Sequence, residues 1–150
     1  MDDEEIQELN QFEGLIQGLI EDSYGCCNDF VLQDTVIGLA ANMAILNDAG
    51  KMKTAGIGNK MDFQKDKLIR SDKINWIEQQ STNQYEVIFL KKIWRFINHL
   101  NKTCFTSIKS FECHYSNYEQ GSFYKRHLDQ FNNEDGRKYS IAYRFAVPFK

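Results

Sequence analysis

His127 and Asp129 are the residues whose types and spacing most suggest metal chemistry. In a β-strand, residues i and i+2 project from the same face, so a strand here would direct the imidazole and the carboxylate into one cavity. One nitrogen and one hard oxygen are two of the three ligands of a 2-His-1-carboxylate facial triad, which binds ferrous iron and keeps other positions open. Alone, His-x-Asp is a weak signal, because either residue is more often a surface or hydrogen-bonding group.

The residues before this pair give it a context. From Tyr118 to Asp129 the chain reads Tyr-Glu-Gln-Gly-Ser-Phe-Tyr-Lys-Arg-His-Leu-Asp. This block closely resembles the one that leads into the metal ligands of bacterial prolyl-4-hydroxylase-like 2-oxoglutarate/iron(II) oxygenases. Other elements are similar to that family in the same order: Ala-Gly-Ile-Gly at 55–58, Ile-Arg-x-Asp-x-Ile-x-Trp at 69–76 and Arg-Lys-Tyr-Ser at 137–140. The resemblance covers roughly residues 52–140.

The resemblance implies a fold and a reaction. The expected fold is α+β, with N-terminal helices packed on a double-stranded β-helix, a distorted jelly roll of the cupin type. The expected reaction couples oxidative decarboxylation of 2-oxoglutarate to hydroxylation of a prolyl or similar residue in a protein or peptide. His127 and Asp129 would be the first two iron ligands, and Tyr118 would hydrogen-bond the 2-oxoglutarate carboxylate. Iron(II) and 2-oxoglutarate are the expected cofactor and co-substrate, and ascorbate is a further candidate.

Tyr124 has two interpretations. By the same resemblance it could line the substrate entrance. It could equally be an ordinary aromatic packing residue, because strand alternation would put it on the face opposite to His127. The packing interpretation is at least as well supported by the sequence.

The sequence departs from the family on its C-terminal side. The family has a second histidine and then a basic residue downstream, whereas this sequence stops at Lys150. His99 and His114 precede the motif, and neither is expected to replace the missing ligand. Arg144 could take over the carboxylate salt bridge, since a guanidinium suits bidentate binding, but a divergent or truncated end is the preferred interpretation. The β-helix is therefore expected to be incomplete at the C-terminus.

Two functions follow from these observations. The first is a 2-oxoglutarate- and iron(II)-dependent dioxygenase. The alternative is a catalytically inactive fragment or remnant of the family that acts as a protein-binding module through an uncovered sheet. Coding sequence beyond Lys150 that contained a histidine followed by an arginine or lysine would favour the enzyme. The identity of the substrate and the oligomeric state stay open.

Composition bounds the class of protein. The chain has 150 residues, 42% of them hydrophobic, which suits a single domain at 1–150 with a real core. Its net charge of −3 predicts neither nucleic acid nor an anionic membrane as a partner. The acidic start and the lack of an apolar run near ~20 residues predict a cytoplasmic protein. The spacing of the four cysteines predicts reduced thiols.

The order of elements predicts helical support at 1–101 and the start of the β-helix at 102–150. A helical period runs from Asp3 to about Ile20. A second helix is expected after an Asp29 cap, and a third from a cap at Ser81 or Thr82 to about residue 100. Trp76 and Trp94 are expected in the core. Strands are expected near 52–57 and within 105–115, 118–131 and 138–147.

Overall fold

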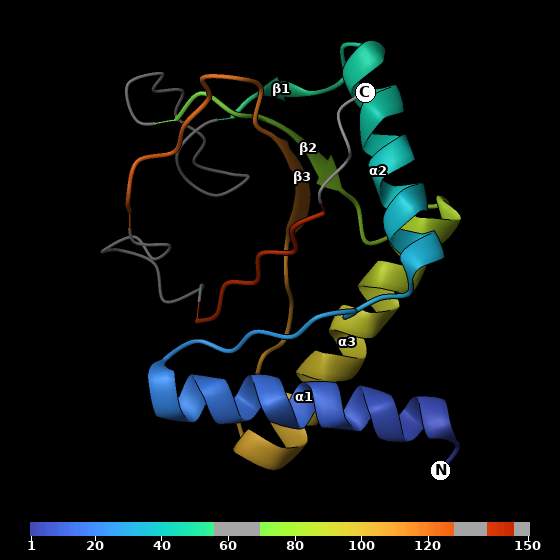
Figure 1. Ribbon diagram of the computed structural model, residues 1–150, viewed down its shortest axis with the longest axis vertical. Coiled ribbons are helices and arrows are strands. Elements are labelled where there is room, and N and C mark those ends of the chain that lie inside the picture. The colour runs from blue at the N-terminus through green and yellow to red at the C-terminus, as the bar shows by residue number, and fades with distance from the viewer. Residues whose placement is uncertain (56–69, 128–137, 146–150) are drawn as a thin grey trace. The chain divides into compact units, whose positions relative to one another are not determined.

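The computed structural model describes residues 1–55, 70–127 and 138–145. Within these ranges it contains three helices and a three-stranded antiparallel sheet (Figure 1). The helices are α1 (Asp3–Asp22), α2 (Gln33–Asp48) and α3 (Gln84–Cys104), and the strands are β1 (Lys53–Thr54), β2 (Lys73–Ile77) and β3 (Cys113–Asn117). The predicted α+β class is confirmed.

The chain forms two compact units. The first unit consists of Met1–Leu39 and Glu78–Phe111, and the second of Ala40–Ile77 and Glu112–Lys150. Helices dominate the first unit, and the sheet lies in the second. No helix of the described residues is both long and apolar enough to cross a membrane.

Helix α1 of the first unit begins where the sequence predicts. A capping box forms there, in which the Asp2 side chain accepts from the Glu5 amide and the Glu5 side chain accepts from the Asp2 amide. The helix ends at Ser23, whose φ of 66° is left-handed. Phe12 and Ile16 form its buried stripe, so this helix is held by one apolar face and by reciprocal bonds at its start.

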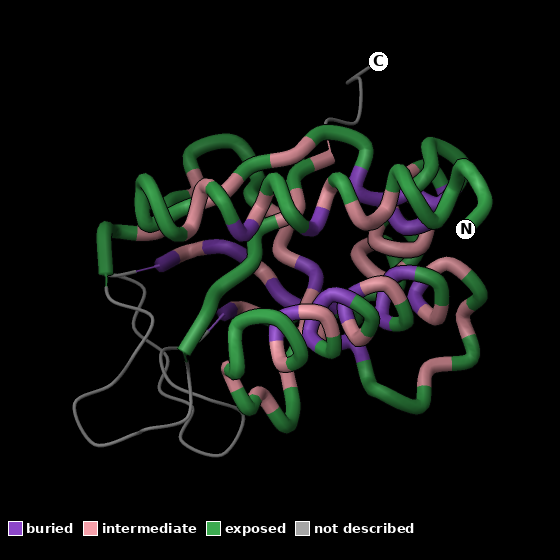
Figure 2. The backbone as a smooth tube through the Cα atoms, turned by 90° about the horizontal axis from the view of Figure 1, so that it is seen from below, coloured by how far each residue is buried: buried purple, intermediate pink, exposed green. Residues whose placement is uncertain are grey.

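Helix α3 supplies most of the first unit's core. Its buried apolar residues recur at three- and four-residue steps (Figure 2): Phe89, Leu90, Ile93, Phe96, Ile97 and Leu100. Phe12 packs on Phe96 with ring centroids 5.0 Å apart. The helix starts one residue later than a Thr82 cap would require, because the Asn83 side chain accepts from the Tyr85 and Glu86 amides.

A charged network joins α1 to α3. Arg95 donates to Glu8 through Nε at 2.6 Å and through Nη2 at 2.8 Å, which is a bidentate pair. Lys92 Nζ lies 3.6 Å from the same carboxylate. The hydrogen bond from Arg95 and the charges of both cations lower the pKa of Glu8 below its usual value, although burial opposes this.

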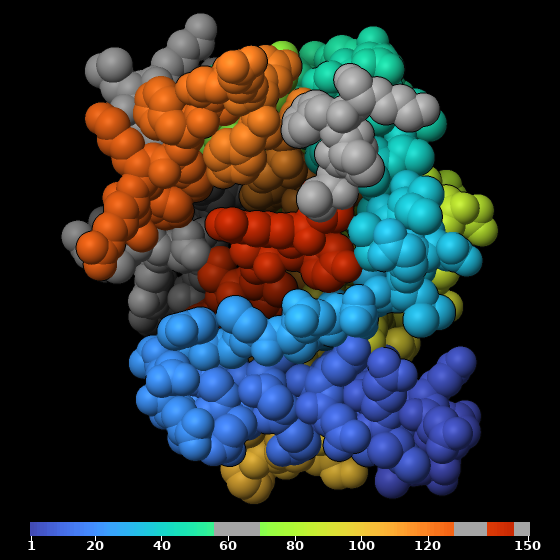
Figure 3. Space-filling model, viewed as in Figure 1, coloured from blue at the N-terminus to red at the C-terminus, as the bar shows by residue number. Residues whose placement is uncertain are grey.

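The segment after α1 folds back along that helix (Figure 3). Gln11 of α1 donates from Nε2 to the main-chain oxygen of Asp29 at 2.8 Å. Asp29 has a φ of 55°, whereas an N-cap residue has an extended backbone. The predicted cap at Asp29 is therefore wrong, and α2 begins at Gln33 after a turn in which Leu32 accepts from the Thr35 and Val36 amides.

The sheet of the second unit has the order β1-β2-β3, with antiparallel neighbours. Trp76 faces His114 across the β2 and β3 pair. Ile74, Ile77 and Tyr115 are buried, and the Tyr115 hydroxyl accepts from Asn42 of α2 at 3.2 Å. The second half of α2 is thus tied to β3 by a hydrogen bond.

The strand predictions had mixed outcomes. The short strand expected near 52–57 is confirmed as β1. Strand β3 overlaps only the end of the region expected at 105–115 and continues to Asn117. Strand β2 was not predicted, because its alternating pattern mixes charged and polar residues with apolar ones. Residues 138–145 form no strand, so that prediction is wrong over the described part of 138–147. The double-stranded β-helix stays a prediction.

Both tryptophans are less buried than predicted. Each is half-buried and packs edge-on: Trp76 against His114 at 5.1 Å, and Trp94 against Phe111 at 5.2 Å between centroids. Trp94 also donates from Nε1 to Gln79 at 3.1 Å. Partial exposure suits an indole, whose polar N–H needs a partner.

Candidate functional site

The segment that carries His127 is anchored to the residues just before β2. After β3 the chain reverses in a turn, where the Ser122 amide donates to Glu119 at 2.8 Å and Gly121 adopts a φ of 84°. Two bonds then join Phe123 to Ser71. The Ser71 amide donates to the Phe123 carbonyl at 2.9 Å, and the Phe123 amide donates to Ser71 Oγ at 3.0 Å.

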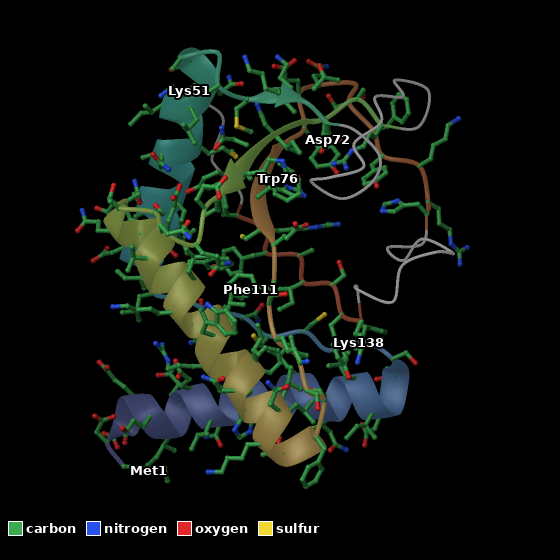
Figure 4. The ribbon with its side chains drawn as sticks, turned by 180° about the vertical axis from the view of Figure 1, so that it is seen from behind. Met1, Lys51, Asp72, Trp76, Phe111 and Lys138 are labelled. Carbon is green, nitrogen blue, oxygen red and sulfur yellow. The ribbon has the colours of Figure 1, made fainter. Side chains whose placement is uncertain are left out.

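Arg70 and Asp72 form a buried ion pair beside this anchor. Their side chains are 8% and 0% exposed, with Nε to Oδ1 at 2.7 Å and Nη2 to Oδ2 at 2.6 Å. Asp72 stands immediately before β2 (Figure 4), and its carbonyl accepts from the Ala55 amide at 2.8 Å. Burial alone would lower the pKa of Arg70, but its hydrogen bond to Asp72 and the charge of that carboxylate raise it.

Tyr124 packs between Arg70 and His127. The guanidinium carbon of Arg70 lies 4.1 Å from the centroid of the Tyr124 ring. The His127 ring is stacked on the same ring, with centroids 3.6 Å apart and planes 16° apart. Both distances are close to van der Waals contact, so the two groups must occupy opposite faces of the phenol. We call Arg70, Tyr124 and His127 the Arg70–Tyr124–His127 stack.

This geometry corrects the expectation from strand alternation. Tyr124 and His127 were predicted on opposite faces of one strand. In the structure Tyr124 makes only an isolated bridge to Arg70, and residues 125–127 are in no strand. An irregular backbone does not alternate its side chains, and for this reason the two rings lie against each other.

The His127 imidazole is exposed but fixed in orientation. Its Nδ1 lies 2.7 Å from the carbonyl oxygen of Lys125. A carbonyl can only accept, so Nδ1 carries the proton and the neutral imidazole has its lone pair on Nε2. Metal-ligating histidines usually donate their other ring N–H in this way. The structure therefore fits a metal-binding role for His127.

Asp129 lies outside the described residues, and its pairing with His127 stays a prediction. Within the described part of the chain, no group of three or more His, Cys, Asp or Glu could hold a metal. His99 lies 2.5 Å from Glu13, and His114 contacts Ser116 at 3.2 Å. Both of these histidines thus have partners within their own units.

Tyr118 follows β3 directly and lies near the same ion pair. Burial and the charge of Asp72 raise the pKa of its hydroxyl, against the opposing charges of Arg70 and Arg144. A phenol is protonated at neutral pH already at its ordinary pKa of 10.0, so this hydroxyl is able to donate to a carboxylate. The charges of both members of the Arg70–Asp72 pair therefore act on the Tyr118 hydroxyl. Tyr118 remains 49% exposed, as a ligand-binding hydroxyl should be.

Sequence reasoning missed Arg70 and Asp72 as site residues. They were included only as part of the family-like element at 69–76, and no role was assigned to them. A signal was present, because Arg70, Asp72 and Ile74 alternate with the less buried Ser71 and Lys73. Opposite charges two residues apart, in phase with an apolar strand position, share a face and can pair there.

Comparisons with known proteins give an informative likeness to a solved structure. No protein-family model matches the chain, and no curated protein matches it in sequence. Among solved structures, the crystal structure of a Pseudomonas putida prolyl-4-hydroxylase is similar, with a TM-score of 0.71 and 26% identity. The match covers 80% of this chain and 62% of that protein. The chain is thus related in structure to a prolyl-4-hydroxylase and spans less than two thirds of its length.

Proposed function

We propose that this chain belongs to a 2-oxoglutarate- and iron(II)-dependent dioxygenase that hydroxylates a prolyl or similar residue in a protein. The observation that carries the proposal is the likeness to the Pseudomonas putida prolyl-4-hydroxylase over 80% of the chain. The matching metal motif at His127 supports the same conclusion. We further propose that residues 1–150 are one domain, with helical support at 1–101 and the start of a double-stranded β-helix at 102–150.

The residues of the site have distinct proposed roles. His127, through Nε2, and Asp129 would hold the iron, and Tyr118 would donate a hydrogen bond to a carboxylate of 2-oxoglutarate. The bound iron and 2-oxoglutarate would supply the oxidation of a C–H bond. His99 and His114 are not assigned as ligands, because each packs in its own unit on a different partner.

An anaerobic titration tests the proposal. We expect Mn²⁺, used in place of Fe²⁺, to bind the chain, and 2-oxoglutarate to bind only after the metal. His127→Ala should weaken Mn²⁺ binding by about 100-fold, since loss of even an outer partner of a ligand costs about 10- to 100-fold. Isothermal calorimetry measures both affinities.

His114→Ala is the control, because it removes a half-buried histidine of the second unit that is not a proposed ligand. This variant should bind Mn²⁺ like the parent chain. If the parent and His127→Ala bind Mn²⁺ equally, the proposed site is wrong. That outcome would favour the alternative, a catalytically inactive relative that binds proteins.

A further inference from the structure

The Arg70–Asp72 pair is the most buried charged feature among the described residues of the second unit. Such a pair is weak evidence for stability, because taking two charges out of water costs about as much as their attraction returns. A bidentate guanidinium–carboxylate pair does define geometry well, since its two parallel bonds fix the plane of the guanidinium. The pair therefore suggests a role in positioning another group.

The group next to the pair is Tyr124. The guanidinium of Arg70 covers one face of the phenol at 4.1 Å, and the His127 ring covers the other at 3.6 Å. Stacking of a planar guanidinium on an aromatic ring combines cation–π attraction with close packing. The guanidinium of Arg70 thus supports one face of the Tyr124 ring, and the His127 ring lies nearly parallel to that ring on the other face.

The backbone holds the same parts together. Asp72 accepts from Ala55 beside β1, and the paired bonds between Ser71 and Phe123 join the residues next to Arg70 and Tyr124. Main-chain bonds thus fix the residues that are adjacent in sequence to Arg70 and to Tyr124. His127 itself has a second restraint, because its Nδ1 is bonded to the Lys125 carbonyl. An exposed imidazole would otherwise rotate freely about its side-chain bonds.

We infer that Arg70, Asp72 and Tyr124 are positioning residues that preset the plane of the His127 imidazole for metal binding. The part of this inference that concerns metal rests on the proposed function. The part that concerns the ring does not, because it follows from contacts within the chain. Outer residues that orient a metal ligand affect metal affinity although they never touch the metal.

NMR spectroscopy of the metal-free chain with isotope-labelled histidine tests the ring directly. The chain has three histidines, and His127→Ala assigns the signals of His127. Tyr124→Leu removes the ring, and Arg70→Lys keeps the positive charge but removes the planar fork. Both variants should shift the His127 ring-proton signals, whereas Tyr124→Phe, which retains the ring, should leave them near the parent values.

Signals of His99 and His114 report the folded state of the two units in the same spectra. If Arg70→Lys unfolds the second unit, the comparison of Tyr124→Leu with Tyr124→Phe decides whether the Tyr124 ring positions His127. His127 signals that stay unchanged in Tyr124→Leu would overturn the inference. Signals that respond to Tyr124→Leu but not to a folded Arg70→Lys would overturn the role of the ion pair.

Mn²⁺ calorimetry of the same variants separates this inference from the proposed function. We expect Arg70→Lys and Tyr124→Leu to weaken Mn²⁺ binding by about tenfold. Tyr124→Phe, which retains the ring, should bind Mn²⁺ with the affinity of the parent chain. If the parent chain binds no Mn²⁺ although the His127 signals respond, the proposed function fails and the positioning of the ring stands. If Mn²⁺ binds equally well to all variants, the proposed function stands and the positioning role toward metal fails.

Discussion

Tyr118 is the residue proposed to contact 2-oxoglutarate. Burial raises the pKa of its hydroxyl above the ordinary 10.0, and a phenol is protonated at neutral pH even at that ordinary value, so it can donate to an anion. Tyr118→Phe should weaken 2-oxoglutarate binding to the Mn²⁺-loaded chain by about tenfold, because a hydrogen bond to a charged group is lost. Mn²⁺ affinity should not change. Calorimetry with each ligand in turn measures both, and equal 2-oxoglutarate affinities would contradict the proposed role.

At the residue scale, the sequence suggested candidate site residues but not their geometry. His127 and Tyr118 were proposed from residue type and resemblance, and their roles stay predictions. The stacking of Tyr124 on His127 was not predicted, because a strand was expected through His127. The structure has no strand at that residue. Arg70 and Asp72 act through a contact with Tyr124 that lies more than fifty residues away in the sequence. Spacing rules describe neighbours within an element and cannot detect such a contact.

Close contact between two helical elements gives a test of packing in the first unit. A Cβ added at Gly38 of α2 would lie 2.3 Å from the ring of Tyr85 on α3, whereas at Gly14 of α1 it would meet nothing within 4 Å. Gly38→Ala should therefore lower the unfolding free energy by about 1–3 kcal/mol. Gly14→Ala should raise it by about 0.5–1 kcal/mol, because alanine favours the helix. Urea unfolding distinguishes them; a stabilised Gly38→Ala would contradict the packing.

At the element scale, helices were predicted better than strands for a physical reason. The apolar period of α1 and α3 extends over several turns, so their existence is overdetermined. Their starts depend on which of several capping residues is used, and Asn83 was used where Ser81 and Thr82 were also available. Strand β2 has only five residues. Its partners lie far away in the sequence, so local pattern alone did not reveal it.

At the scale of the whole molecule, the stability of the fold should depend on Glu8. Its lowered pKa means that the folded chain favours the carboxylate, so its contribution is present above the ordinary pKa of 4.5 and is lost as pH falls through the lowered value. Glu8→Gln should cost about 1 kcal/mol at pH 7, since the Arg95 partner is half-exposed. The cost should be smaller at pH 3 than at pH 7.

Chemical denaturation of parent and variant at both pH values measures this dependence. Glu112→Gln is a suitable control, because Glu112 is exposed and lies outside the network of Glu8, Lys92 and Arg95. A Glu8→Gln cost that is the same at pH 3 and pH 7 would contradict an ionic origin.

The order in which the two units occur along the chain has a consequence for synthesis on the ribosome. Each unit is made of two separate segments, and the segments alternate: 1–39, 40–77, 78–111 and 112–150. When residue 77 has emerged, the nascent chain holds one half of each unit and the whole of neither. The first unit can close only after Phe111 has appeared, and β2 must wait for β3. Apolar faces such as that of α1 are therefore available to chaperones until about residue 111 has emerged from the ribosome.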